Sequence, residues 1–175
     1  MLIYILIGLA VLVVIILIAA SAKPDTVCYE RSVVISAPPD RILPHITDFH
    51  KWSAWSPWEK KDPDMKRKYT GTPSGKGAKY AWIGNGKVGE GSMEVRDVIS
   101  NAVNIDMRFI KPFKNDCDMW FRCTPEGPGT KVNWSMESRN LFMGKVMSLL
   151  INMDKMIGKD FENGLADLKK QAETN

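Results

Sequence analysis

Residues 102–110 read AVNIDMRFI, and apolar side chains alternate with polar ones through most of this stretch. The apolar set is Val103, Ile105, Met107 and Phe109, and the polar set is Asn104, Asp106 and Arg108. A period of two is typical of a β-strand that buries one face and exposes the other to water. The stretch therefore predicts a strand of an antiparallel sheet with one apolar face.

Neighbouring segments carry the same alternation and are separated by turn signals. Residues 76–83 and 87–99 flank residues 84–86, Gly-Asn-Gly, where the Asn-Gly step is typical of a tight hairpin because both residues tolerate positive φ. Residues 100–101, Ser-Asn, form a second turn signal. The later apolar faces consist of Cys117, Met119, Phe121 and Cys123, and then of Val132, Trp134 and Met136. Residues 66–139 therefore predict an antiparallel meander.

The C-terminal segment has a different period. Between residues 141 and 171 apolar side chains recur at intervals of three and four, which is typical of a long amphipathic helix. They are Val146, Leu149, Leu150, Met153, Ile157, Phe161, Leu165 and Leu168. With a strand at 27–36 and a short helix at 40–49, this pattern predicts an α+β fold in which a curved antiparallel sheet wraps around the C-terminal helix.

The N-terminal segment predicts a membrane helix. Leu2 to Ala20 carry no charged side chain and are almost wholly Leu, Ile, Val and Ala. A helix of roughly 20 residues matches the roughly 30 Å hydrocarbon layer of a bilayer. The alternative is a cleaved secretory signal, because residues 20–22, Ala-Ser-Ala, form a small-residue cleavage site. No basic region precedes the apolar run, so we expect an uncleaved anchor at residues 1–23 and one domain at 24–175.

The charge pattern bears on which side of the membrane the domain occupies. Lys23 and Arg31 follow the apolar run, and no Lys or Arg precedes it. The positive-inside tendency therefore favours a single-pass protein with its domain in the cytoplasm. The margin is two residues, and large domains translocate regardless of a few charges, so the side stays open.

Composition argues against nucleic-acid and metal chemistry. The 24 Lys and Arg exceed the 20 Asp and Glu only mildly, without the dense basic stripe of a nucleic-acid binder. His45 and His50 are five residues apart, which places them on different faces of a helix without a third ligand. We therefore predict no metal site, no cofactor and no nucleic-acid partner.

The cysteine and glycine patterns favour structural roles over a disulfide framework or a nucleotide site. Cys117 and Cys123 lie in one strand, about 20 Å apart, which is beyond disulfide reach. Gly84-x-Gly86-x-x-Gly89 matches a dinucleotide fingerprint in letters, but that motif must open a helix and here it opens a strand. We expect buried thiols and no nucleotide site.

Aromatic and thioether side chains mark the candidate site. Trp52, Trp55 and Trp58 stand within seven residues, and we expect them to close one end of the core, with a second role as a pocket rim. Ten methionines are present, several of them on the inner sheet faces and the final helix. Flexible thioethers that face each other across a sheet and a helix fill a core or line an adaptable cavity.

Several segments together resemble a known superfamily. They are the strand and stop at 31–40, RSVVISAPPD; the segment Asp48-x-x-x-Trp52-x-x-Trp55-Ser-Pro-Trp58; the Pro125-Glu-Gly-x-Gly-Thr130 turn; and the long final helix. This pattern, over residues 27–172, resembles the START-related SRPBCC superfamily and its bacterial polyketide cyclase/dehydrase members. The resemblance implies a helix-grip fold with a deep apolar cavity. It does not fix an activity, because the superfamily includes lipid carriers, receptors, cyclases and oxygenase domains.

Three functions follow as hypotheses. The first is a membrane-anchored module that binds a hydrophobic small molecule such as a lipid, a quinone or a polyketide-like compound. The second is a cyclase or dehydratase that uses the same cavity, for which the sequence names no catalytic residue. The third is a structural interaction domain whose core is filled by its own side chains. For the first, we expect a cavity lined by residues from Tyr80, Trp82, Met93, Met107, Phe109, Met119, Phe121, Trp134, Met136 and Met147.

Overall fold

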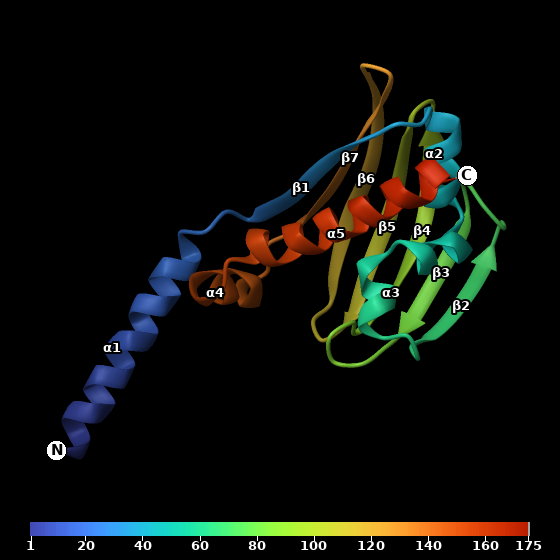
Figure 1. Cartoon of the computed structure of the whole chain (residues 1–175). Helices are drawn as coiled ribbons and strands as arrows, with labels where there is room; N and C mark the ends of the chain where they lie inside the picture. The colour runs from blue at the N-terminus through green and yellow to red at the C-terminus, as the bar shows by residue number, and fades with distance from the viewer. Residues whose placement is uncertain (175) are drawn as a thin grey trace.

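The computed structural model describes residues 1–174 and contains one seven-stranded antiparallel sheet gripped around a long helix (Figure 1). The strands are β1 (Thr26–Ile35), β2 (Lys66–Gly71), β3 (Ala78–Ile83), β4 (Glu90–Ile99), β5 (Ala102–Lys111), β6 (Asn115–Glu126) and β7 (Gly129–Arg139). The helices are α1 (Leu2–Ser21), α2 (Pro39–Thr47), the 3₁₀ helix η1 (Phe49–Ala54), α3 (Pro57–Lys61), α4 (Phe142–Leu150) and α5 (Met153–Thr174). The α+β helix-grip prediction is confirmed.

The sheet order is β1-β7-β6-β5-β4-β3-β2, so that every pair except β1 and β7 is consecutive in sequence. Thr26 at the start of β1 pairs with Arg139 at the end of β7. The β3–β4 and β5–β6 connections lie at this same end of the sheet, where α1 also joins, and we refer to it as the α1 end. The β4–β5 and β6–β7 turns lie at the opposite end, which we call the far end.

The predicted alternation along residues 102–110 is confirmed on the sheet's inner face. Val103 and Ile105 are fully buried, and Met107 is almost so. Helix α5 crosses this face and buries the apolar stripe Phe161, Leu165 and Leu168. Sheet and helix therefore share one core, as their periodicities predict.

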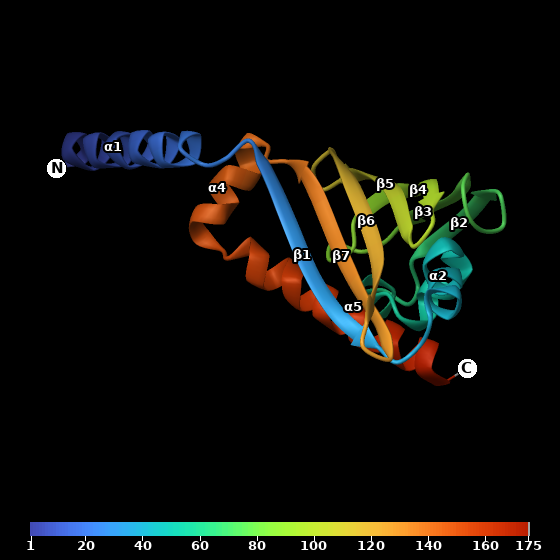
Figure 2. The same ribbon diagram turned by 90° about the horizontal axis from the view of Figure 1, so that it is seen from above.

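The C-terminal segment is two helices, whereas the sequence predicted one over 141–171. Ile151 is extended, with φ −128° and ψ 135°, and it separates α4 from α5. The Asn152 side-chain oxygen accepts a hydrogen bond from the Lys155 amide at 2.9 Å, the geometry by which Asn begins a new helix. Helix α4 therefore leaves the line of α5 and lies beside α1 (Figure 2).

The β3–β4 connection is also longer than expected. The antiparallel β3–β4 hairpin is confirmed, but the strands end at Ile83 and begin again at Glu90, so residues 84–89 connect them instead of the expected 84–86. The Asn85 amide instead donates to the Asp62 carboxylate at 2.6 Å, and the positive φ falls on Gly89, at 72°. A contact with a distant loop has therefore overridden the local turn preference. The Ser-Asn turn is confirmed, with Ser100 at φ 48°.

Helix α1 is long and apolar enough to cross a membrane, and it projects from the domain (Figure 1). Of its residues only Ala20 is buried. Its chain reaches β1 through residues 22–25 alone, so the domain begins immediately after the helix ends.

Candidate ligand-binding cavity

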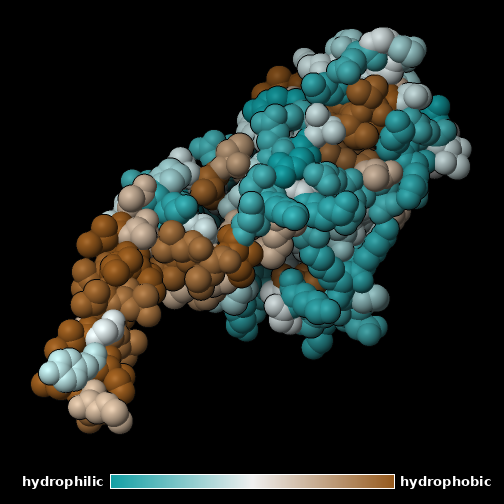
Figure 3. All heavy atoms as spheres, turned by 60° about the vertical axis from the view of Figure 1, so that its left-hand side comes forward, coloured by the Kyte–Doolittle hydropathy of each residue, from teal (hydrophilic) through white to brown (hydrophobic). Residues whose placement is uncertain are grey.

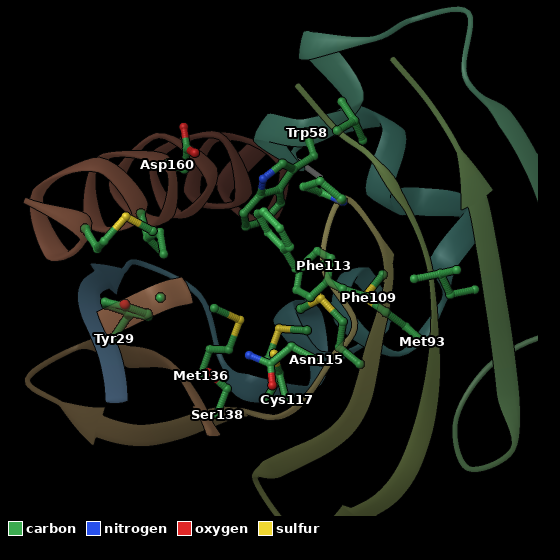
Figure 4. Close-up of a pocket in the computed structure, with 18 of the residues that line it drawn as sticks. Tyr29, Trp58, Met93, Phe109, Phe113, Asn115, Cys117, Met136, Ser138 and Asp160 are labelled. Carbon is green, nitrogen blue, oxygen red and sulfur yellow. The ribbon is translucent and has the colours of Figure 1, made fainter. Parts of the chain in front are cut away.

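A cavity of about 780 Å³ lies between the concave face of the sheet, α5 and α3. Figure 4 shows side chains from the strands and from the helical layer pointing into one open space, among them Tyr29, Met136, Cys117 and Trp58. Its lining includes the start of β1, the end of β7 and the β5–β6 connection, all of which belong to the α1 end of the sheet. The cavity therefore occupies the α1 end of the core.

Most residues expected from the sequence do line this cavity. They are Tyr80, Trp82, Met93, Met107, Phe109, Met119 and Met136. Each points inward because it occupies the buried register of its strand, as for Met119 and Met136, which are paired across β6 and β7. Their binding role remains a proposal.

Phe121, Trp134 and Met147 lie outside the lining. Phe121 and Trp134 stack with ring centroids 4.9 Å apart, and the Trp55 ring packs edge-on against both. All three are fully buried, so this aromatic cluster fills the core toward the far end and leaves no open space there. Met147 lies on α4, which the break at Ile151 directs away from the sheet.

The three clustered tryptophans are divided between packing and lining. Trp52 and Trp55 are buried, and their indole N–H groups donate to the backbone oxygens of Ile46 and His45 at 2.9 and 3.0 Å. Trp52 and Trp58 also line the cavity. The segment therefore both closes the core and contributes to the cavity wall.

The sequence did not identify the most notable polar group of the wall, Glu59. Its carboxylate is buried, accepts a hydrogen bond from the Tyr80 hydroxyl at 2.7 Å and meets the Arg67 guanidinium at 2.8 Å. Burial and this carboxylate raise the pKa of Tyr80 well above its ordinary value, so the phenol stays protonated. Glu59 lies on the short helix α3, in a charged stretch of sequence without apolar periodicity, and only the fold brings it to Tyr80.

The buried thiols are part of the apolar wall and core. Cys117 lines the cavity, Cys123 is buried elsewhere on β6, and both are free. Burial raises the pKa of each to about 11, so both are neutral thiols at physiological pH. Among residues 1–174, no cluster of three or more His, Cys, Asp or Glu side chains is arranged to hold a metal ion.

The cavity mouth carries basic side chains. Lys87, Lys114 and Arg139 are exposed and line its α1 end. Lys61, another exposed basic residue of the lining, pairs with Asp160 of α5 at 2.5 Å and so neutralises the one acidic residue that α5 contributes to the lining. The arrangement suits a ligand with a large apolar body and a polar or anionic end.

Residues 26–173 match the family profile described as polyketide cyclase / dehydrase and lipid transport. No curated protein matches the sequence significantly.

Solved structures share the fold at low identity. The solution structure of KanY is 19% identical with a TM-score of 0.59, over 85% of this chain and 98% of KanY. CV1439 from Chromobacterium violaceum is 15% identical with a TM-score of 0.58, over 86% and 99%. DynU16, from the dynemicin biosynthetic locus, is 16% identical with a TM-score of 0.58, over 87% of this chain and 48% of DynU16. At these identities the likeness concerns the fold alone.

Proposed function

The chain belongs to the polyketide cyclase / dehydrase and lipid transport family, and from this premise we propose that it is a membrane-anchored module that binds a hydrophobic small molecule. The ligand would be a lipid, a quinone or a polyketide-like compound held between the sheet and α5. Membership agrees with the SRPBCC resemblance of the sequence. It leaves the choice between carrier and enzyme to the site itself.

The observation that carries the proposal is the cavity. Protein interiors are packed closely and contain few voids larger than a water molecule. The cavity between the sheet and α5, in contrast, measures about 780 Å³. That volume is within the roughly 300–1,000 Å³ of small-molecule sites. Met93, Met107, Met119 and Met136 supply flexible thioethers that adapt to apolar ligands of different shape. A core filled by its own side chains would have no such space.

Helix α1 supplies the proposed membrane attachment. It has the length and hydropathy of a single span, so the protein would consist of an anchor at residues 1–23 and a binding domain at 24–175. The two basic residues that follow the span favour the cytoplasmic side for the domain. A membrane location suits a ligand that partitions into lipid.

A cyclase or dehydratase activity is the second candidate, and Glu59 is the observation that favours it. A buried carboxylate in the wall of an apolar cavity is a typical position for a proton-transferring group. Tyr80 and Arg67 already occupy both carboxylate oxygens, however, and this arrangement is typical of a group that holds the cavity wall in place. The variant Glu59→Gln separates the two roles. If Glu59 is catalytic, the variant should bind ligand with unchanged affinity and lose turnover; if Glu59 holds the wall, the variant should bind ligand more weakly.

The binding proposal is tested with the full chain in lipid nanodiscs and a panel of apolar probes: a fluorescent fatty acid, a short-chain quinone and a polycyclic aromatic. Trp52, Trp58 and Trp82 line the cavity, so a bound probe should change tryptophan emission saturably and raise the melting temperature. Empty nanodiscs correct for partitioning of the probe into lipid. A panel that changes neither emission nor melting temperature would favour the filled-core reading.

A further inference from the structure

Helix α4 has an apolar surface that packing within the chain does not explain. None of its nine residues is buried. The exposed side chains on and beside it are Leu141, Phe142, Met143, Leu149, Leu150 and Ile151. Leu150 is 79% exposed. We call these six residues the α4 surface. A continuous exposed patch of this kind marks an interaction site.

The α4 surface is continuous with the proposed membrane anchor. Helix α4 contacts α1, and Figure 3 shows the apolar surface of α1 running onto the adjoining part of the domain. Three contacts hold the connector against the domain. The Lys145 ammonium lies 2.6 Å from the Asp25 carboxylate, the Asn140 backbone amide donates to the Asp25 carbonyl at 2.7 Å, and the Asn140 side-chain amide donates to the Pro24 carbonyl at 2.9 Å. The connector, residues 22–25, spans at most roughly 15 Å. A membrane crossed by α1 would therefore lie close to α4.

The mouth of the cavity opens beside the same surface. Five of its lining residues are both apolar and exposed: Ile110, Phe113, Leu141, Met143 and Met156. Leu141 and Met143 belong to the α4 surface itself. The exposed basic residues Lys87, Lys114 and Arg139 stand around this mouth, where they would meet anionic lipid headgroups. An apolar rim with basic neighbours is the pattern of a surface that lies in a membrane interface.

We propose that the α4 surface lies in the interface of the bilayer that α1 crosses, so that the cavity mouth opens onto lipid and the ligand passes between bilayer and cavity without crossing water. The bilayer is the occupant because the short connector brings it to α4 whatever other partners are present. The route for the ligand rests on the proposed binding function. The membrane contact of α4 does not.

The contact is tested by labelling single positions in the full chain in anionic phospholipid vesicles. Leu150→Cys carries an environment-sensitive fluorophore on α4, and Ile99→Cys is the matched control, 53% exposed at the far end of the sheet. Both are made with Cys28→Ser, because Cys28 is the exposed native thiol. We expect lipids that carry a nitroxide in the upper acyl chain to quench the label at position 150 several-fold more strongly than at position 99.

The ligand route is tested by the rate at which a pyrene-labelled fatty acid leaves the vesicles for the protein. Leu150→Glu should slow uptake by about tenfold, because a charge opposes insertion of α4 into the interface, whereas Ile99→Glu should leave the rate unchanged. Equal quenching at positions 150 and 99 would overturn the inference. A label at 150 that is shielded from water but not quenched would mean that a second protein copy covers α4, which also overturns it. Quenching without uptake by any variant would refute the binding function and leave the membrane contact standing.

Discussion

Replacement of Met119 by tryptophan should reduce ligand binding while the fold is retained. Met119 is fully buried on β6, yet it lines the cavity, so a larger side chain has empty space in front of it. Its pairing with Met136 on β7 and with Ile105 on β5 fixes the direction of the side chain toward α5. The indole in Met119→Trp therefore extends into the volume that a ligand would use.

The size of the effect follows from the surface that the ligand would lose. If the indole displaces about 60–100 Å² of apolar ligand contact, the loss at roughly 25 cal/mol per Å² is about 1.5–2.5 kcal/mol. That corresponds to a rise in Kd of about 10- to 70-fold. The stability of the fold should change little, because the indole has empty space to occupy. Overpacking would lower the free energy of unfolding by at most about 1–3 kcal/mol.

Phe121→Trp is the matched control. Phe121 lies two residues along the same strand on the same face, but it is packed between Trp52, Trp55 and Trp134 and lies outside the lining. Enlarging it has no void to fill, so it should destabilise the domain without changing affinity directly. The assay is titration of a fluorescent fatty acid and thermal unfolding of both variants in nanodiscs. Equal destabilisation of the two variants, with unchanged affinity in Met119→Trp, would refute a cavity in front of Met119.

Three other predictions concern the helices and the anchor. Gly164→Ala should lower the free energy of unfolding by about 1–3 kcal/mol although alanine favours helices, because its Cβ would lie 2.9 Å from the Trp134 ring; unchanged stability on chemical denaturation would contradict this. An Arg31 hydrogen bond lowers the pKa of Asp154 below 3.8, so this carboxylate stabilises the fold above that pH and the stabilisation is lost as the pH falls. The melting temperature should therefore drop as the pH falls below about 5, and the drop should be smaller in Asp154→Asn; an equal drop would refute the assignment. A chain that begins at Pro24 should be soluble and folded while the full chain sediments with membranes, and a mature protein that begins at Lys23 would instead support the signal-peptide alternative.

The sequence predicted what depends on local periodicity. The two-residue alternation in the meander and the three-to-four spacing of Phe161, Leu165 and Leu168 both arise because side-chain direction repeats along a strand or helix. These patterns located the sheet, the core face of α5 and seven of the residues that line the cavity. They also placed Phe121 and Trp134 on the correct face. Periodicity gives the face of an element and does not distinguish a packed end of a core from an open one.

The break between α4 and α5 was missed because the apolar spacing continues across it. Met147, Leu150 and Met153 keep helical intervals, although Asn152 begins a separate helix. An Asn followed by a charged turn is a helix-start signal, and it was present in the sequence. This signal at Asn152 predicts that a new helix begins there, so that α4 is separate from the core helix and Met147 lies outside the lining.

The polar part of the site depends on contacts between distant segments. Glu59, Arg67 and Tyr80 come from α3, β2 and β3, and nothing in their spacing indicates a buried carboxylate. The six-residue β3–β4 connection has the same origin, because Asp62 holds Asn85. Such groups become recognisable only when the fold has brought the segments together.

Native mass spectrometry of the full chain, extracted from its own membrane, would show whether the cavity holds a hydrophobic molecule. We expect a retained adduct of lipid-like mass that disappears or weakens in Met119→Trp and persists in Phe121→Trp. A chain whose mass corresponds to the protein alone under conditions that preserve its fold, together with no uptake of added fatty acid or quinone, would contradict it.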